Sequence, residues 1–247
     1  MSNSRTIMVT GVAAYWGDQL SRLLLDDTPD HVIGIDRTVP RVPSHENLDF
    51  VQADVRNRLL TDLLRQEQVD TVYHLAWPPE SDQATAALDN LLHACAETGV
   101  AHFIWVSSTA VYGPLPTNAA FIDEDQSPYT KETAGPLFDL IAGEQLCFDF
   151  ARHYPHLKLT VLRPAHIVGP QAPGPMNRYL SGSVAPVLLG FDPMMQVVDE
   201  RDLLLALRHA LDAPPVSVGS EHIPANLYQY NVAAADLLPL TRLLSLT

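Results

Sequence analysis

Short apolar runs alternate with amphipathic helical patterns along the first two thirds of the chain. The runs are continuously apolar, which is typical of parallel strands buried on both faces. We expect strands at 7–9, 32–35, 50–51, 71–75, 102–106 and 157–162, and helices at 16–26, 56–68, 84–98 and 137–153. Right-handed crossovers between such strands predict an α/β fold of the Rossmann type, with a doubly wound parallel sheet.

The pattern changes after residue 169. Residues 170–193 are rich in proline and glycine and predict an irregular excursion. Beyond it we expect a short apolar run at 195–198, a helix at 200–211, a strand at 228–232 and a last helix at 234–246. We interpret residues 1–247 as a single NAD(P)-binding Rossmann domain with a small, shortened C-terminal substrate lobe. The elements of that lobe are expected mainly in 170–200 and 215–247.

Composition narrows the classes of function. A chain of 247 residues with 47% hydrophobic residues can bury a substantial core. Its net charge of −14 argues against nucleic-acid partners and anionic membranes. The polar start of the chain does not resemble a signal peptide, so we expect a cytoplasmic protein with no membrane partner. Cys95 and Cys147 have no partner spacing and are expected to be buried free thiols, and no pattern indicates a metal site.

A glycine-containing turn follows the first predicted strand, in the segment Val-Thr-Gly-Val-Ala-Ala-Tyr-Trp-Gly at 9–17. Gly11 allows the tight turn, Gly17 allows the helix to pack closely on the strand, and the amides at the helix start can hold a pyrophosphate. Ala14 stands where the middle glycine of the usual motif would be, so its methyl group would crowd the pyrophosphate. The candidate cofactor residues of this turn are Gly11, Ala14, Tyr15, Trp16 and Gly17.

Acidic residues end the second and third predicted strands. The carboxylate of Asp36 can accept hydrogen bonds from both adenosine ribose hydroxyls and would repel a 2′-phosphate, which favours NAD. Arg37 and Arg41 follow, and either can pair with a 2′-phosphate, so NADP stays open. Asp54 is placed to reach the adenine amino group. With the end of the fourth strand, the candidate cofactor residues here are Asp36, Arg37, Asp54, Val55, Leu75, Ala76 and Trp77.

These motifs resemble the NAD-dependent epimerase/dehydratase family, the extended short-chain dehydrogenases/reductases. Two further segments carry the resemblance, Val-Ser-Ser-Thr-Ala-Val-Tyr-Gly at 106–113 and Leu-Arg-Pro-Ala-His-Ile-Val-Gly-Pro at 162–170. The resemblance covers nearly the whole chain and implies an NAD(P)H cofactor. It places Ser107, Pro164, His166 and Ile167 beside that cofactor, and Ser108 matches the catalytic Ser/Thr that hydrogen-bonds the reacting oxygen. It also allows a homodimer through helices 84–98 and 137–153, although both are apolar enough merely to pack on the sheet.

The family's catalytic pair is missing from its expected place. The family uses Tyr-x-x-x-Lys on the helix after the fifth strand, where the lysine lowers the tyrosine pKa and the tyrosine transfers a proton. Glu144 fixes the register, because the family's glutamate stands eight residues after the tyrosine and four after the lysine. Counting back places Pro136 at the tyrosine position and Leu140 at the lysine position.

Two segments resemble this pair without matching it. Tyr129 follows Ser-Pro as in the family, but Lys131 is only two residues further on. Residues 135–136, Gly-Pro, are expected to break a helix that starts at Tyr129, although a shifted alignment would restore Tyr129 as the base. Tyr154 and Lys158 have the right spacing but enter the sixth strand. Lys131 and Lys158 are the only two lysines of the chain, so we expect no Tyr-Lys pair.

Three functions remain open. The first is an atypical ketoreductase that passes a hydride from NAD(P)H to a ketone held by Ser108, with a proton from His166 or from a phenol of the substrate. In lacking the catalytic tyrosine, the chain resembles relatives that reduce aromatic polyketides, such as angucyclinones, in antibiotic biosynthesis. Its modest length and the apolar stretch 185–195 favour a compact aromatic substrate over a nucleotide sugar. The alternatives are a conventional epimerase or dehydratase with Tyr129 as base, and a non-catalytic NAD(P)-binding sensor.

Overall fold

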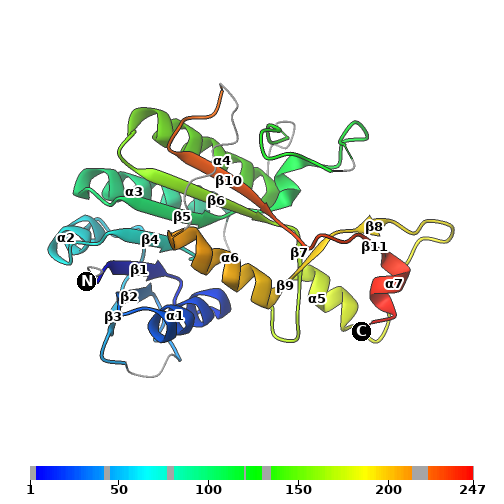
Figure 1. Ribbon diagram of the computed structural model, residues 1–247, viewed down its shortest axis with the longest axis horizontal. Helices are drawn as coiled ribbons and strands as arrows, with labels where there is room; N and C mark the ends of the chain where they lie inside the picture. The colour runs from blue at the N-terminus through cyan, green and yellow to red at the C-terminus, as the bar shows by residue number, and fades with distance from the viewer. Residues whose placement is uncertain are drawn as a thin grey trace.

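A seven-stranded parallel sheet forms the centre of the computed structural model, which describes residues 4–41, 45–76, 81–119, 121–129, 135–212 and 222–246 (Figure 1). The strands are β1 (Thr6–Thr10), β2 (His31–Asp36), β3 (Leu48–Gln52), β4 (Thr71–His74), β5 (His102–Val106), β6 (Lys158–Pro164) and β10 (Leu227–Val232). Their order is β10-β6-β5-β4-β1-β2-β3, and every neighbouring pair is parallel. The predicted doubly wound sheet is confirmed.

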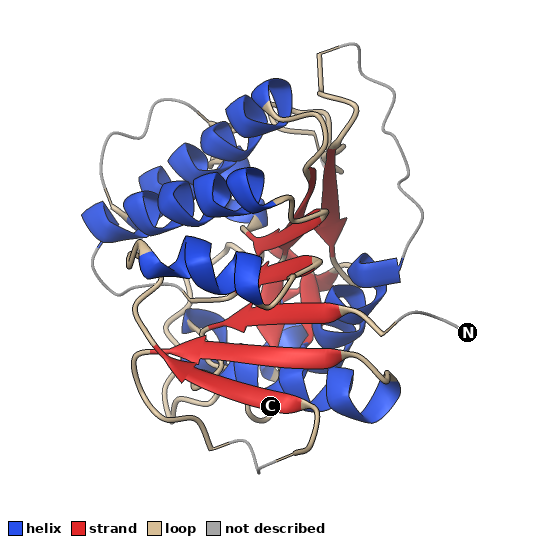
Figure 2. Cartoon of the chain, turned by 90° about the vertical axis from the view of Figure 1, so that its left-hand side faces the viewer, coloured by secondary structure: helices blue, strands red, loops and turns tan. Residues whose placement is uncertain are grey.

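Two layers of helices cover the sheet (Figure 2). The helices are α1 (Tyr15–Asp27), α2 (Leu59–Gln66), α3 (Ser81–Thr98), α4 (Pro136–His153) and α6 (Glu200–Asp212). One face packs against α2, α3 and α4, and the other against α1 and α6. Successive residues of β1 enter opposite layers, Met8 one core and Ile7 and Val9 the other. Burial on both faces explains why the strands are continuously apolar. Within the described residues, no helix is both long and apolar enough to cross a membrane.

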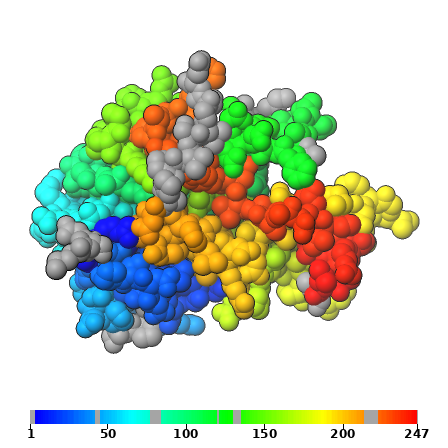
Figure 3. Space-filling model, viewed as in Figure 1, coloured from blue at the N-terminus to red at the C-terminus, as the bar shows by residue number. Residues whose placement is uncertain are grey.

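A small lobe follows the carboxyl ends of β6 and β10 (Figure 1). Here β7 (His166–Val168) pairs with β9 (Val197–Asp199), and β8 (Met194–Met195) pairs with β11 (Leu238–Pro239). Two short helices complete it, α5 (Pro175–Leu180) and α7 (Leu240–Leu244). Its outer loop projects from the body, as the yellow region of Figure 3 shows, and exposes Val184, Val187, Leu188, Leu189 and Phe191.

The structure corrects the predicted elements of this lobe. The helix predicted at 234–246 is wrong, because Pro239 lacks a backbone N–H and favours an extended residue before it, so the chain forms β11 before the short α7. The excursion at 170–193 is not wholly irregular, since Pro175 starts α5. β10 joins the main sheet beside β6, so the lobe takes its C-terminal elements from the residues after β10. Cys95 and Cys147 are free and buried, as predicted.

Candidate cofactor-binding and active site

The turn after β1 brings backbone atoms closer together than side chains would allow. Gly11 has φ +77°, and a Cβ atom there would lie 2.7 Å from the backbone nitrogen of Ala76. A Cβ atom on Gly17 would lie 2.1 Å from the carbonyl oxygen of Gly11. Ala14 has φ −85° and ψ 162°, an extended conformation open to any residue, so alanine in place of the middle glycine does not strain the backbone. The sequence therefore builds the turn with two essential glycines.

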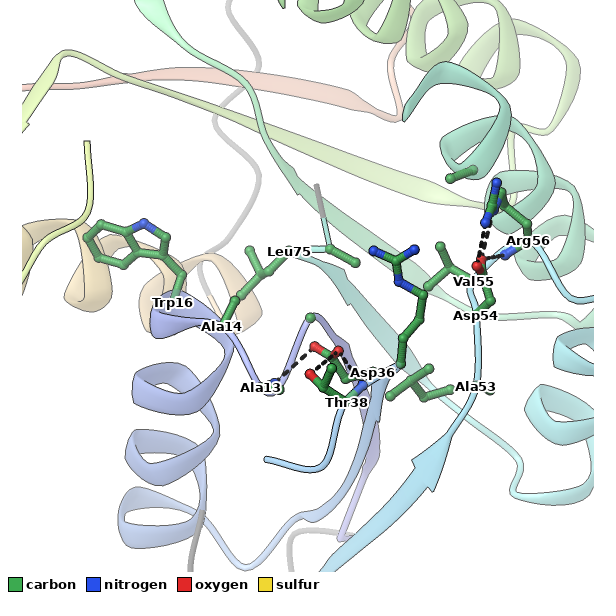
Figure 4. A pocket seen from close by; sticks show the side chains of 15 residues that line it. Ala13, Ala14, Trp16, Asp36, Thr38, Ala53, Asp54, Val55, Arg56 and Leu75 are labelled. Carbon is green, nitrogen blue, oxygen red and sulfur yellow. Dashed lines mark hydrogen bonds and ion pairs between the residues drawn. The ribbon is translucent and has the colours of Figure 1, made fainter. Parts of the chain in front are cut away.

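A cavity of about 410 Å³ opens at this turn, at the carboxyl ends of β1, β2, β3 and β4 (Figure 4). It lies where the strand order reverses between β1 and β4, the usual ligand crevice of doubly wound sheets. Its lining brings together nine predicted cofactor residues, Gly11, Ala14, Trp16, Asp36, Arg37, Asp54, Val55, Leu75 and Ala76, with Ala13, Ile35, Thr38, Ala53, Arg56 and Ala87.

Asp36 is held in place at one wall of this cavity (Figure 4). Its Oδ2 accepts a hydrogen bond from Ala13 N at 3.0 Å, and its Oδ1 accepts from the backbone and hydroxyl of Thr38, both at 3.0 Å. A carboxylate offers about four acceptor sites, so Oδ2 retains capacity for a ribose hydroxyl. The contact with Ala13 links the acidic end of β2 to the glycine turn, and both parts of the predicted cofactor site are fixed together.

Asp54 pairs with Arg56, a residue that none of the sequence motifs indicated. Arg56 donates from Nε to Asp54 Oδ1 at 2.9 Å and from Nη2 to Oδ2 at 2.6 Å. The guanidinium lowers the pKa of Asp54 to about 2, so the carboxylate is ionised at neutral pH. This pair and Trp16 lie at opposite ends of the view in Figure 4. The spacing of Asp54 and Arg56 in the sequence was the available signal, because a side chain two residues on can fold back onto a strand-end carboxylate.

Asp36→Asn is expected to weaken NAD⁺ binding by about 1–3 kcal/mol, because charge-assisted hydrogen bonds to the ribose become neutral ones. NADP⁺ should lose less affinity or gain some, since the charge that repels its 2′-phosphate is removed. Calorimetric titration of both nucleotides checks this, and asparagine keeps the shape of the side chain and one of its two acceptor oxygens. Equal weakening of the two nucleotides would show that Asp36 does not read the ribose.

A second cavity, of about 210 Å³, adjoins the first and shares Trp16 and Leu75 with it. Its lining is mainly apolar and consists of Trp16, His74, Leu75, Trp105, Val106, Ser107, Leu140, Ile167, Leu203 and Leu207. Ser107 and Ile167, both predicted beside the cofactor, lie here. The lining of the two cavities does not include Tyr15, Gly17, Ser108, Pro164 or His166, and Trp77 lies outside the described residues.

A buried polar network holds Ser107 at the end of β5. Ser107 Oγ donates to Glu144 Oε1 at 2.6 Å, and Glu144 forms a buried ion pair with Arg163 at 2.6 Å. Arg163 Nη1 also donates to the hydroxyl of Tyr112 at 2.8 Å, and that hydroxyl donates to Asn231 Oδ1 at 2.8 Å. The network fixes β5 against α4, β6 and β10, and so sets the shape of the second cavity.

The residues predicted to be catalytic stand apart from this cavity lining. Ser108 caps the 3₁₀ helix η1 (Thr109–Tyr112), and its Oγ accepts from Ala110 N at 3.2 Å. His166 is exposed at the start of β7. Tyr15 turns toward the start of α6, where burial and a hydrogen bond to Glu200 raise its pKa to about 12.

The expected Tyr-Lys positions hold neither a phenol nor an amine. Pro136 is the first residue of α4, and Leu140, one turn later, lines the second cavity. Tyr129 precedes the helix; its backbone N–H donates to Val111 O at 2.7 Å, and its ring lies against Gly113. Lys158 starts β6, at the opposite end of the sheet from the cavities. Lys131 lies outside the described residues.

Comparison with known proteins gives one family match and several longer relatives. The model of the NAD dependent epimerase/dehydratase family matches residues 7–214. An uncharacterized protein of Mycobacterium tuberculosis is 29% identical over 221 residues, covering 83% of this chain and 59% of its own length. A Bacillus subtilis protein named as an uncharacterized UDP-glucose epimerase is 27% identical over 194 residues, covering 67% of this chain and 57% of its own. The chain thus spans less than two thirds of the length of these two relatives.

Solved structures share the fold. MoeE5 in complex with UDP-glucose and NAD superposes with a TM-score of 0.75 at 23% identity, covering 97% of this chain and 80% of that protein. A dTDP-glucose 4,6-dehydratase from Bacillus anthracis in complex with NAD gives a TM-score of 0.77 at 16% identity, covering 98% of this chain and 79% of its own. The sheet order and both helical layers therefore belong to a known architecture.

Proposed function

Because the chain belongs to the NAD-dependent epimerase/dehydratase family, we propose that it transfers a hydride from NADH to the ketone of a compact aromatic substrate without a Tyr-Lys pair. The family is NAD-dependent by its description, which agrees with the predicted nicotinamide dinucleotide. The choice of NAD over NADP rests on Asp36, whose carboxylate faces the first cavity. The choice of an aromatic substrate rests on the missing Tyr-Lys pair and on the exposed apolar side chains of the stretch 185–195.

The residues of the first cavity fit a dinucleotide. Side chains at Gly11 and Gly17 would overlap backbone atoms, so the close turn after β1 needs both glycines. The amides at the start of α1 would then hold the pyrophosphate. Asp36 would hold the adenosine ribose, and Asp54 with Arg56 would border the adenine. When bound, the cofactor supplies the hydride. The chain's own residues then have to hold the ketone and provide for its proton.

Leu140 is the observation that carries the proposal. It lies where the family's lysine would be, and its side chain lines the second cavity together with Ser107. An alkyl group there cannot lower the pKa of a phenol, and Pro136 offers no hydroxyl one turn earlier. A proton for the alkoxide must come from another donor.

A phenol next to the carbonyl of the substrate is the donor that we propose. Hydride adds to the carbonyl carbon, the π pair becomes a lone pair on oxygen, and that oxygen takes the phenol proton; the phenolate then regains a proton from water. An internal donor has a high effective molarity. Ser108, next to the network-held Ser107, would orient the carbonyl, and His166 would be the protein donor if the phenol is not. The exposed apolar side chains of Val187, Leu188 and Leu189 would offer the aromatic ring of the substrate an apolar surface.

The experiment offers 8-hydroxy-1-tetralone with NADH and, separately, UDP-glucose with NAD⁺. We expect NADH consumption at 340 nm and formation of the alcohol from the ketone, and no UDP-galactose from UDP-glucose. A nucleotide-sugar epimerase is the second candidate, favoured by the position of the Tyr129 ring beside Gly113 and by the name of the Bacillus subtilis relative. Formation of UDP-galactose without ketone reduction would select it. Cofactor binding with neither reaction would select the sensor.

A further inference from the structure

A fully buried histidine meets the second cavity with one ring nitrogen unpaired. His74 ends β4, is 2% exposed and lines this cavity. Its Nδ1 lies 2.9 Å from Thr10 Oγ1, whereas its Nε2 has no hydrogen-bond partner within the part of the chain that the structure describes. Buried polar atoms are nearly always paired, and leaving one unpaired is unfavourable. An unpaired atom at a cavity wall points to a ligand that completes it.

The hydrogen bonds of Thr10 assign the ring proton to Nε2. Thr10 Oγ1 lies 3.2 Å from Leu75 N and 3.2 Å from Ala76 N, and both of these groups can only donate. The hydroxyl hydrogen is then available for His74 Nδ1, which accepts it. Burial lowers the pKa of His74 to about 4, so at neutral pH the ring is uncharged and carries its one proton on Nε2. A residue of the cavity lining therefore carries an N–H donor that has no partner among the described residues.

Ser107 presents the complementary acceptor in the same cavity. Its Oγ donates its only hydrogen to Glu144 Oε1 at 2.6 Å, so the oxygen can only accept from a ligand. The remaining lining side chains are apolar apart from the indole N–H groups of Trp16 and Trp105. A flat apolar ring that bears a hydrogen-bond acceptor and a donor on one group matches this wall. A primary carboxamide on an aromatic ring has that chemistry.

We propose that His74 Nε2–H and Ser107 Oγ bind the carboxamide of the nicotinamide, with its oxygen accepting from His74 and its NH₂ donating to Ser107. The inference rests on the proposed function, since it needs NAD(H) in the cleft. The linings of the two cavities share Trp16 and Leu75. Trp16 lies at the end of the first cavity away from the Asp54–Arg56 pair, as Figure 4 shows. A dinucleotide with its adenine at Asp54 would reach the second cavity with its other end.

Titration of NAD⁺ and of ADP-ribose, which lacks the nicotinamide, tests this on the wild type, His74→Gln and His74→Met. Glutamine can place an amide N–H near the position of Nε2, and methionine has the same length without a donor. Both variants change the contact with Thr10 equally. We expect the methionine variant to bind NAD⁺ about 10-fold more weakly than the glutamine variant, the loss of one hydrogen bond. ADP-ribose should bind both variants alike, which also shows that the cleft is intact.

Equal NAD⁺ affinities of the two variants would overturn the inference, and so would an equal loss of ADP-ribose affinity in the methionine variant. A wild type that binds neither nucleotide would instead overturn the proposed function itself, and the inference with it. If neither variant folds, an NMR measurement on the wild type decides. The ¹H–¹⁵N signal of His74 Nε2–H should shift with NAD⁺ and not with ADP-ribose, and the same shift with both nucleotides would reject the carboxamide contact.

Discussion

Arg163→Met is expected to lower the free energy of unfolding by about 3–5 kcal/mol, because it leaves a buried carboxylate without its cation. The side chains of Arg163 and Glu144 are each 1% exposed and lie 2.6 Å apart. Without the guanidinium, Glu144 keeps the 2.6 Å hydrogen bond from Ser107 and a contact of 3.5 Å with Gln229. Neither neutral group can balance the charge, and Tyr112 also loses its donor.

Arg65→Met is the matched control for this change. Arg65 pairs with Asp62 on α2 at 3.3 Å, but the two side chains are 58% and 62% exposed. An exposed pair contributes about 0–1 kcal/mol, so this variant should unfold almost as the wild type does. Urea unfolding followed by tryptophan fluorescence gives both values. If Arg163→Met loses no more stability than Arg65→Met, the network does not hold β5 against α4 as described.

Methylation of the substrate phenol is expected to slow ketone reduction by about 10²–10⁴-fold, the usual contribution of a general acid. The methyl ether of 8-hydroxy-1-tetralone keeps the ring and the carbonyl but has no proton to give. The isomer 6-hydroxy-1-tetralone is the control, because its phenol is too far from the carbonyl to donate. It should also react slowly although its acidity is retained. If a protein donor such as His166 supplied the proton instead, all three ketones would be reduced at similar rates.

The sheet could be predicted because its strands are buried on both faces, so that they contain continuous apolar runs such as 7–9 and 103–106. The end of the chain was predicted wrongly, because residues 234–246 have leucines at helical spacing. Pro239 prevents one continuous helix there, and the chain forms β11 instead. The acidic residues at the strand ends, Asp36 and Asp54, were found by the same logic as the strands. Parallel strands bring their carboxyl ends to one edge of the sheet, so a polar residue there faces the cleft.

Pairings between distant residues are the part that the sequence did not reveal. Thr10 meets His74 across 64 residues, and only that contact shows which ring nitrogen remains unpaired. The two adjacent serines are a second feature that the sequence did not resolve. The motif alone could not tell that Ser107 lines the cavity while Ser108 caps the following turn. Glu144 served as a register marker in the sequence, and the structure shows that its carboxylate binds Ser107.

Single-turnover reduction by the wild type and by Tyr129→Phe tests the central claim, hydride transfer without a Tyr-Lys pair. Each enzyme is loaded with NADH and mixed with 8-hydroxy-1-tetralone, and the decay at 340 nm is followed. Phenylalanine keeps the ring that packs on Gly113 and removes only the hydroxyl. We expect the two rates to agree within about 10-fold, below the 10²–10⁴-fold effect of a lost general acid. A loss of that full size in Tyr129→Phe, with ketone binding unchanged, would make Tyr129 the proton donor and contradict the account.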